Sequence, residues 1–256
     1  MKTKQIIIAM LALLLAETGM ASSFESLGKE WYEKRAEGAE GTVAKPKPIN
    51  QAIAFYEKAF VQSPSEEITV ALLRCYYFKG SFVPMTTEEQ KFIFSKGKNL
   101  GEAMTKQYPA SASIKYWLAA HLGKWAKVYG VFSSAKEGVA DKIKSLGEEV
   151  IKLDPDYNDA GGYEILGLVH LYSPNIPFFL TWPSCKLAIE NLQKASCLAP
   201  TIANNLCLAQ ALLKAGNKVM ATALLKKTST MVPREEKIIE DRNGLQQVLE
   251  LLEQLK

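Results

Sequence analysis

Prolines recur along this chain at near-equal intervals. They stand at Pro64, Pro109, Pro155 and Pro200, which are 45, 46 and 45 residues apart, and a shorter step of 33 residues leads to Pro233. Proline ends a helix because it has no backbone N–H and forces the preceding residue out of the α region. A fixed period of roughly 20 to 50 residues with helical patterning inside each unit is typical of stacked helical hairpins. The spacing therefore predicts an all-α solenoid with a concave face.

Small residues precede the prolines at fixed offsets. Ala52, Tyr56 and Ala59 lie 12, 8 and 5 residues before Pro64. The same offsets recur in two later units, at Ala188, Leu192 and Ala195 before Pro200, and at Ala221, Leu225 and Thr228 before Pro233. These positions resemble the second helix of a tetratricopeptide repeat. The resemblance implies a tetratricopeptide-like helix-hairpin solenoid with about five irregular hairpins.

The N-terminus has the layout of a secretory signal. Lys2 and Lys4 precede the apolar run IIIAMLALLLA, and small residues follow up to Ala21. The run is shorter than the ~20 residues that cross a bilayer. We expect residues 1–21 to be a signal peptide and residues 22–256 to form an exported, periplasmic helical domain. No cysteine lies near the cut site, so a lipoprotein anchor is not expected; a retained leader that acts as an anchor is the alternative.

Charge and cysteine content exclude several kinds of site. The formal net charge is only +4, and the lysines are spread along helices, so no nucleic-acid partner is expected. The four cysteines form no CxxC pair and no metal-ligand spacing with either histidine. Cys197 and Cys207 flank the turn at Pro200 and fit either a disulfide or, as the favoured alternative, burial as small hydrophobic residues.

Several strings occur in an order that resembles a transport family. They are YWLAAHLGKWAKVYG at 116–130, VIKLDPDY at 150–157, GGYEILG at 161–167 and the repeat at 185–200. The set, from about Tyr116 to Lys227, resembles the T-component of tripartite ATP-independent periplasmic (TRAP) transporters. The resemblance implies an accessory protein that binds a periplasmic solute-binding protein, takes up a hydrophobic small ligand and self-associates as a homo-oligomer. The missing lipid-anchor cysteine departs from the many lipoproteins of that family.

One predicted helix carries an aromatic stripe. Trp117, His121, Trp125 and Tyr129 recur every four residues and therefore share one side of the helix. Aromatic side chains with polar tips suit a binding surface for a ligand or partner. The alternative, which we favour slightly, is that they fill space between hairpins, because large aromatic residues are heavily buried on average.

A second candidate surface lies in the loop IPFFLTWP at 176–183. Its prolines prevent a regular helix, and it places Phe178, Phe179 and Trp182 in an insertion between repeat helices. Exposed rings would form an apolar patch of the kind that contacts a partner or ligand. Equally, the loop could fold back and plug the side of the solenoid.

The sequence contains no catalytic motif. It has no glycine-rich phosphate loop, no nucleophile elbow and no zinc-ligand pattern, so we expect a non-enzymatic protein without a cofactor or metal. The alternative to the TRAP-type accessory is a generic tetratricopeptide scaffold for envelope protein assembly, since both need the same architecture. A weaker hypothesis is an enzyme that uses His121 with the carboxylates between Asp154 and Asp159.

Overall fold

The computed structural model describes residues 23–176 and 180–256, and within these ranges the chain is helical with no regular strand. A helix over residues 23–33 is followed by α2 (Pro46–Gln62), α3 (Glu66–Phe82), α4 (Thr87–Gln107), α5 (Ala112–Tyr129), α6 (Val131–Lys136), α7 (Val139–Leu153), α8 (Tyr157–Tyr172), α9 (Cys185–Leu198), α10 (Ile202–Lys214), α11 (Lys218–Thr228) and α12 (Ile238–Gln254). Single 3₁₀ turns form η1 (Lys34–Ala36) and η2 (Glu235–Lys237). The predicted all-α fold is confirmed. None of the described helices is long and apolar enough to cross a membrane, and the predicted leader at 1–21 lies outside the described residues.

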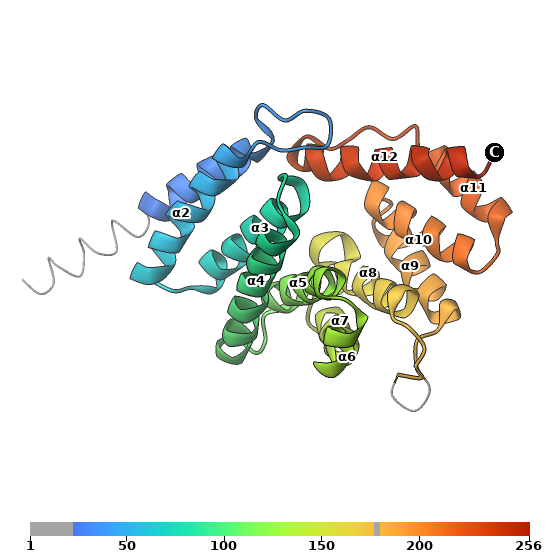
Figure 1. Cartoon of the computed structure of the whole chain (residues 1–256), viewed down its shortest axis with the longest axis horizontal. Coiled ribbons are helices and arrows are strands. Elements are labelled where there is room, and N and C mark those ends of the chain that lie inside the picture. The colour runs from blue at the N-terminus through green and yellow to red at the C-terminus, as the bar shows by residue number, and fades with distance from the viewer. Residues whose placement is uncertain (1–22, 177–179) are drawn as a thin grey trace, which may run out of the picture.

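The helices form two rows along a curved solenoid (Figure 1). In the inner row, α3 contacts α5, α5 contacts α8, and α8 contacts α10. In the outer row, α4, α7, α9 and α11 each pack against the inner helix of the same hairpin. The helix over residues 23–33 pairs with α2, since Gly28 lies against the ring of Tyr56. This arrangement gives the five hairpins predicted from the repeat.

The repeat prolines follow helix ends, and after three of them a capping residue starts the next helix. Ser65, Ser111 and Thr201 stand one or two residues after a repeat proline, and each side chain accepts a hydrogen bond of 3.0 to 3.2 Å from a backbone N–H in the first helical turn. Such caps satisfy backbone groups that have no partner inside the helix. The small residues at the repeat offsets are buried, as the pattern predicts: Ala52, Ala59, Ala188, Ala195 and Ala221 are fully covered.

A glycine sets the distance between α4 and α5. Gly97 lies directly against the imidazole of His121, and a Cβ atom at this position would overlap the ring. Gly101, one helical turn later, lies against Leu118 in the same way. The repeat pattern is weakest in this unit because glycine, rather than alanine, occupies its small positions.

The C-terminal helix α12 joins the two ends of the solenoid. Ile239, near its start, belongs to the core cluster of the N-terminal hairpins, whereas Val248 packs with α10 and α11. Arg35 of η1 adds an ion pair of 3.2 Å to Glu240, and Thr42 contacts Gln246. In Figure 1, α12 accordingly lies beside the N-terminal loop and completes a ring. The repeat pattern did not predict this helix or the closure.

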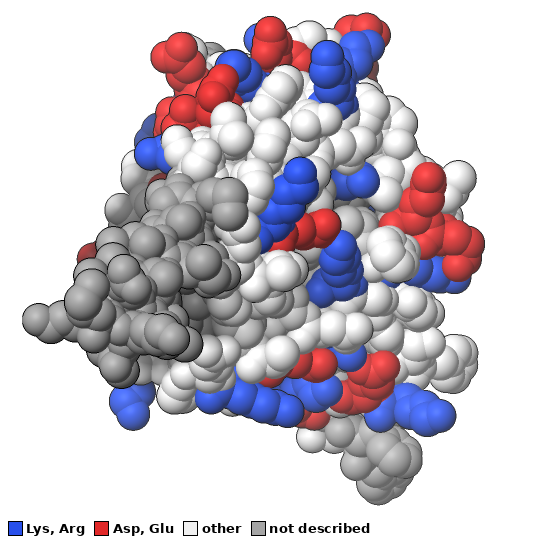
Figure 2. Space-filling view, turned by 90° about the vertical axis from the view of Figure 1, so that its left-hand side faces the viewer, with Lys and Arg blue, Asp and Glu red and all other residues white. Residues whose placement is uncertain are grey.

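The outer surface carries charges of both signs. On the face shown in Figure 2, lysine and arginine side chains alternate with aspartate and glutamate. Along individual helices of the chain, charged side chains form short-range pairs, such as Lys91 with Glu88 and Lys144 with Glu148. Pairs of this kind contribute little to stability, and this face offers no strong field of one sign to a partner.

Candidate binding cavity

The ring encloses a cavity of about 1590 Å³. Its walls come from the helix over residues 23–33, the inner helices α3, α5, α8 and α10, and the start of α12. Glu236 of η2 and one face of α12, from Glu240 to Gln247, close one side. A volume of this size exceeds the usual range for small-molecule sites and can hold an extended peptide segment or a sizeable small molecule.

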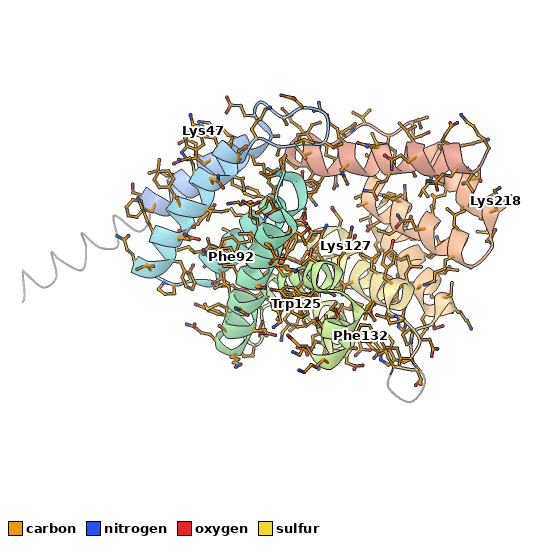
Figure 3. All side chains as sticks on the ribbon, viewed as in Figure 1. Lys47, Phe92, Trp125, Lys127, Phe132 and Lys218 are labelled. Atoms are coloured by element: carbon orange, nitrogen blue, oxygen red, sulfur yellow. The ribbon has the colours of Figure 1, made fainter. Side chains whose placement is uncertain are left out.

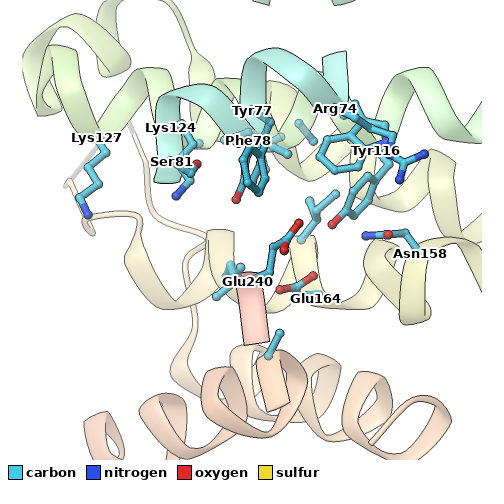
Figure 4. A pocket seen from close by; sticks show the side chains of 18 of the residues that line it. Arg74, Tyr77, Phe78, Ser81, Tyr116, Lys124, Lys127, Asn158, Glu164 and Glu240 are labelled. Atoms are coloured by element: carbon cyan, nitrogen blue, oxygen red, sulfur yellow. The ribbon is translucent and has the colours of Figure 1, made fainter. Parts of the chain in front are cut away.

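Aromatic rings from α3 and α5 form one wall of the cavity (Figure 4). The ring centroids of Tyr77 and Trp117 lie 5.5 Å apart in an edge-to-face contact, and Tyr116 makes a similar contact of 5.5 Å with Tyr157. The indole N–H of Trp117 donates to the Tyr157 hydroxyl over 3.2 Å. Burial raises the pKa values of the Tyr77 and Tyr116 phenols, which therefore remain neutral hydrogen-bonding groups.

Two cations lie on the same wall. Lys124 of α5 places its Nζ atom 5.1 Å from the centroid of the Tyr77 ring, and burial lowers the pKa of its ammonium group. Arg74 of α3 stacks 4.8 Å above the ring of Tyr32. Neither forms an ion pair with a carboxylate in the described part of the chain; Lys124 is half-buried, whereas Arg74 is exposed to solvent.

Two carboxylates enter the cavity from the opposite side. Glu164 of α8 has a raised pKa because it is buried, an effect that Lys237 offsets and Asp159 reinforces. Its contact in the described chain is a long one from the Cys207 thiol, with Sγ and Oε1 3.9 Å apart. Glu240 of α12 accepts from Arg35 with one oxygen, while its buried Oε2 atom has no hydrogen-bond partner among the described residues.

A strained turn at the start of α8 is held by the C-terminal segment. Asn158, Asp159 and Ala160 have φ values of 48°, 62° and 61°, a left-handed conformation that costs roughly 1–2 kcal/mol for each residue. Asp159 accepts hydrogen bonds from Arg234 over 2.8 Å and from Lys237 over 2.7 Å. Burial acts to raise the pKa of Asp159, but these two hydrogen bonds and the adjacent positive charges give a net lowering.

Arg234 is the centre of this network. Its Nε and Nη2 atoms each donate to one oxygen of Asp241 over 2.8 Å, and its Nη1 atom donates to Asp159. Asp241 is only 2% exposed, so Arg234 is the cation that compensates a buried charge. The network joins η2 and α12 to the start of α8 across the edge of the cavity.

The structure divides the predicted aromatic stripe. Trp117 lines the cavity, whereas His121 is fully buried and Trp125 is buried against α4. Trp125 stacks on Tyr129 at 4.3 Å, and the Tyr129 hydroxyl lies 3.1 Å from Ser95 on the outer side. The part of α5 that faces the cavity is a neighbouring stripe that includes Tyr116, Ala120, Lys124 and Lys127.

The predicted loop surface is described only in part. Phe178 and Phe179 lie outside the described residues. Trp182 is half-buried: its indole N–H donates to Asp141 over 2.7 Å, and its ring makes an edge-to-face contact of 5.0 Å with His170. At Trp182, therefore, the loop folds back onto α7 and α8.

The four cysteines are free thiols. Cys207 faces the cavity beside Glu164, whereas Cys197 is exposed on α9 in a shallow pocket on another side of the hairpin. The disulfide that the flanking positions allowed is therefore not formed, and the favoured prediction of burial is wrong for Cys197. Among the described residues, no group of three or more histidine, cysteine, aspartate or glutamate side chains is placed to hold a metal ion.

We expect the buried imidazole of His121 to make stability depend on pH. Its Nε2 atom lies 2.9 Å from the carbonyl oxygen of Leu73, and burial lowers its pKa from 6.5 to about 4, with a smaller contribution from Lys124. Between pH 6.5 and 4 the imidazole is protonated in the unfolded chain but remains neutral in the folded chain. The free energy of unfolding therefore falls by roughly 3 kcal/mol over this range.

Urea unfolding of the native chain and of His121→Gln over this pH range checks the expectation. The variant is less stable at pH 7 but has a shallower decline towards pH 4, because glutamine does not titrate. Equal slopes for the two proteins would show that His121 does not cause the decline.

Arg74, Lys124 and Glu164 line the cavity but were not predicted to do so. They lie on α3, α5 and α8, the inner helices of their hairpins, which line the concave face of such solenoids. A search of these helices for charged residues within apolar surroundings would have found Lys124, which follows LAAHLG, and Glu164, which precedes ILGLV.

Comparison with known proteins supports the fold. No protein-family model matches the chain, and no curated protein matches it. Among solved structures, it is similar to TTC0263, a thermophilic TPR protein of Thermus thermophilus, with a TM-score of 0.61 and 15% identity over 92% of this chain and 98% of that one. The TPR2AB-domain:pHSP90 complex of yeast Sti1 also aligns, with 15% identity over 93% of this chain and 99% of that one, but with a TM-score of only 0.33.

Proposed function

We propose that this protein is a non-enzymatic scaffold that binds a segment of a partner protein in its central cavity. The observation that supports this function is the cavity itself, which combines an aromatic wall with Lys124, a cation without an ion-pair partner in the described chain, and with an unpartnered carboxylate oxygen of Glu240. Tetratricopeptide-like solenoids present an extended concave surface to their partners. Aromatic rings and arginine side chains are the groups that contribute most binding free energy at such surfaces.

A narrower form of this function is an accessory role in a TRAP-type transport system. The sequence strings that resemble the T-component build α5 to α11 and include Tyr116 and Trp117 of the aromatic wall. In this form the protein is exported to the periplasm, its partner is a solute-binding protein, and the rings contact an apolar small ligand. The broader form, a scaffold for envelope protein assembly, needs only the fold and the cavity.

A substitution that fills the cavity tests the broader function. Ala120 lies on the cavity face of α5, one turn before Lys124, and Ala120→Trp would occupy space that a bound segment needs. We expect this variant to lose a partner that the native chain retains in pull-downs, while its melting temperature changes by no more than a few degrees. Lys218→Trp, at an exposed position of α11, is the matched control. Retention by Ala120→Trp together with loss by Lys218→Trp would place binding outside the cavity.

The identity of the retained partner tests the narrower function. We would purify the native chain and Ala120→Trp from periplasmic extract and identify the proteins that depend on an open cavity by mass spectrometry. Recovery of a solute-binding protein supports the TRAP-type role. Repeated recovery of other envelope proteins, without a solute-binding protein, contradicts that role and leaves the scaffold function.

A further inference from the structure

Charged groups of both signs remain without a protein partner inside the cavity. Lys124 forms no ion pair with a described carboxylate, and Glu164 has only the long contact with the Cys207 thiol. Glu240 pairs with Arg35 through one oxygen, but its buried Oε2 atom accepts no hydrogen bond from the described residues. An unpaired charge that is largely removed from water costs free energy. A ligand that supplied the opposite charge at these positions would recover part of that cost.

The two signs do not neutralise each other. Burial alone accounts for the lowered pKa of Lys124, and the charged neighbours that act on Glu164 are Lys237 and Asp159. Figure 4 shows the carboxylates of Glu164 and Glu240 pointing towards the aromatic wall, with Lys124 on one side of them and Arg74 on the other. The cavity therefore has separate positions for a cation and for an anion.

The chain itself shows how a cation is held in this cavity. The guanidinium of Arg35 lies 4.5 Å from the centroid of the Tyr32 ring and 5.4 Å from that of Phe78, and it donates to Glu240. Ring faces and a carboxylate together form a favourable environment for a desolvated cation. Glu164, opposite the rings of Tyr77 and Tyr116, offers the same combination without a resident cation (Figure 4).

We infer that the cavity binds an extended peptide segment of mixed charge. A basic side chain of the segment lies between Glu164 and Glu240 against the aromatic rings, and an acidic side chain pairs with Lys124. This inference rests on the proposed function, because it assumes that a partner segment enters the cavity. It adds the chemistry that selects the segment, since a segment with only one sign of charge leaves either the carboxylates or Lys124 without a partner.

Four capped hexapeptides test the inference. All have four central leucines and differ only in the two end residues. One peptide carries lysine at the start and glutamate at the end. In two others, glutamine replaces either the glutamate or the lysine, and the fourth carries glutamine at both ends. Calorimetric titration of the native chain is expected to show the lysine–glutamate peptide binding at least about tenfold more tightly than the neutral peptide. The two singly charged peptides are expected to have intermediate affinities.

Two variants assign each charge to its position. Lys124→Met should abolish the gain in affinity that the glutamate of the peptide provides, without affecting the gain from its lysine. Glu164→Gln should abolish the gain in affinity from the lysine of the peptide, without affecting the gain from its glutamate. Both variants should melt no earlier than the native chain, because each removes an unpaired charge. Lys218→Met, at the exposed start of α11, is the matched control (Figure 3).

The outcomes separate the inference from the proposed function. If all four peptides bind equally well, or if neither variant changes their order, the charge assignment is overturned and segment binding stands. If none of the peptides binds, segment binding in the cavity is overturned together with the inference.

Discussion

Replacing Arg234 by methionine is expected to lower the free energy of unfolding by about 3 kcal/mol. The guanidinium donates to both oxygens of Asp241, a carboxylate that is 2% exposed, and to Asp159 in the strained turn of α8. Without it, Asp241 keeps only the backbone N–H of residue 234 as a donor from this segment. Breaking a buried ion pair is costly because the remaining charge stays buried without compensation.

The loss of stability should be greatest where α12 closes the ring against the start of α8. We expect amide hydrogens of α12 and of the first turn of α8 to exchange much faster in Arg234→Met, whereas those of α4 and α5 change little. Arg242→Met removes an exposed arginine from the same helix and should alter stability by less than about 0.5 kcal/mol.

A second substitution distinguishes a charge effect from lost packing. Adding Asp241→Asn to Arg234→Met removes the uncompensated carboxylate, so the double variant should recover part of the lost stability. A double variant that is as unstable as the sum of the two single variants would show that the ion pair does not stabilise the closure.

Replacing Gly97 by alanine is expected to lower the free energy of unfolding by about 2 kcal/mol or more, although alanine favours helices over glycine by about 1 kcal/mol. The new methyl group would overlap the His121 ring, which is fully buried and held against the carbonyl of Leu73. Either the buried ring or α4 must therefore shift, which disturbs the packing between α4 and α5. We expect a fall in melting temperature of roughly 5–10 °C.

Gly123→Ala is the matched control in the neighbouring helix. A Cβ atom at Gly123 meets nothing within 4 Å, because this face of α5 borders the cavity. The same chemical change should therefore stabilise the protein by about 0.5–1 kcal/mol through helix propensity alone. Thermal unfolding followed by circular dichroism measures both variants. Equal shifts of the same sign would contradict the close contact between α4 and α5.

Much of the fold could be predicted from local patterns. The repeat prolines and the alanines before them predicted five hairpins because helix ends and close helix contacts depend on residues that are near each other in sequence. The fit was poorest where Gly97 and Gly101 replace alanine. There the size of the partner side chains, His121 and Leu118, decides what fits, and those side chains come from the next unit.

For the candidate site, the sequence could predict that α5 contributes aromatic residues, but not which side of α5 faces the cavity. On α5, the stripe that begins at Trp117 and the stripe that begins at Tyr116 have the same helical period, so periodicity cannot tell which faces the cavity. The contact of His121 with Gly97 turns His121 towards α4 and leaves Ala120 and Lys124, with Trp117 of the predicted stripe, lining the cavity.

The ring depends on the tertiary structure alone. The sequence by itself determined that the chain forms helical hairpins, where most of them end and which residues pack within each pair. Whether their curvature brings the ends together depends on small rotations between successive hairpins, which add up over the whole chain and have no local signature. Only at that scale do Arg35 and Glu240, or Asp159 and Arg234, become neighbours. The cavity, with its unpaired charges, exists because those distant residues meet.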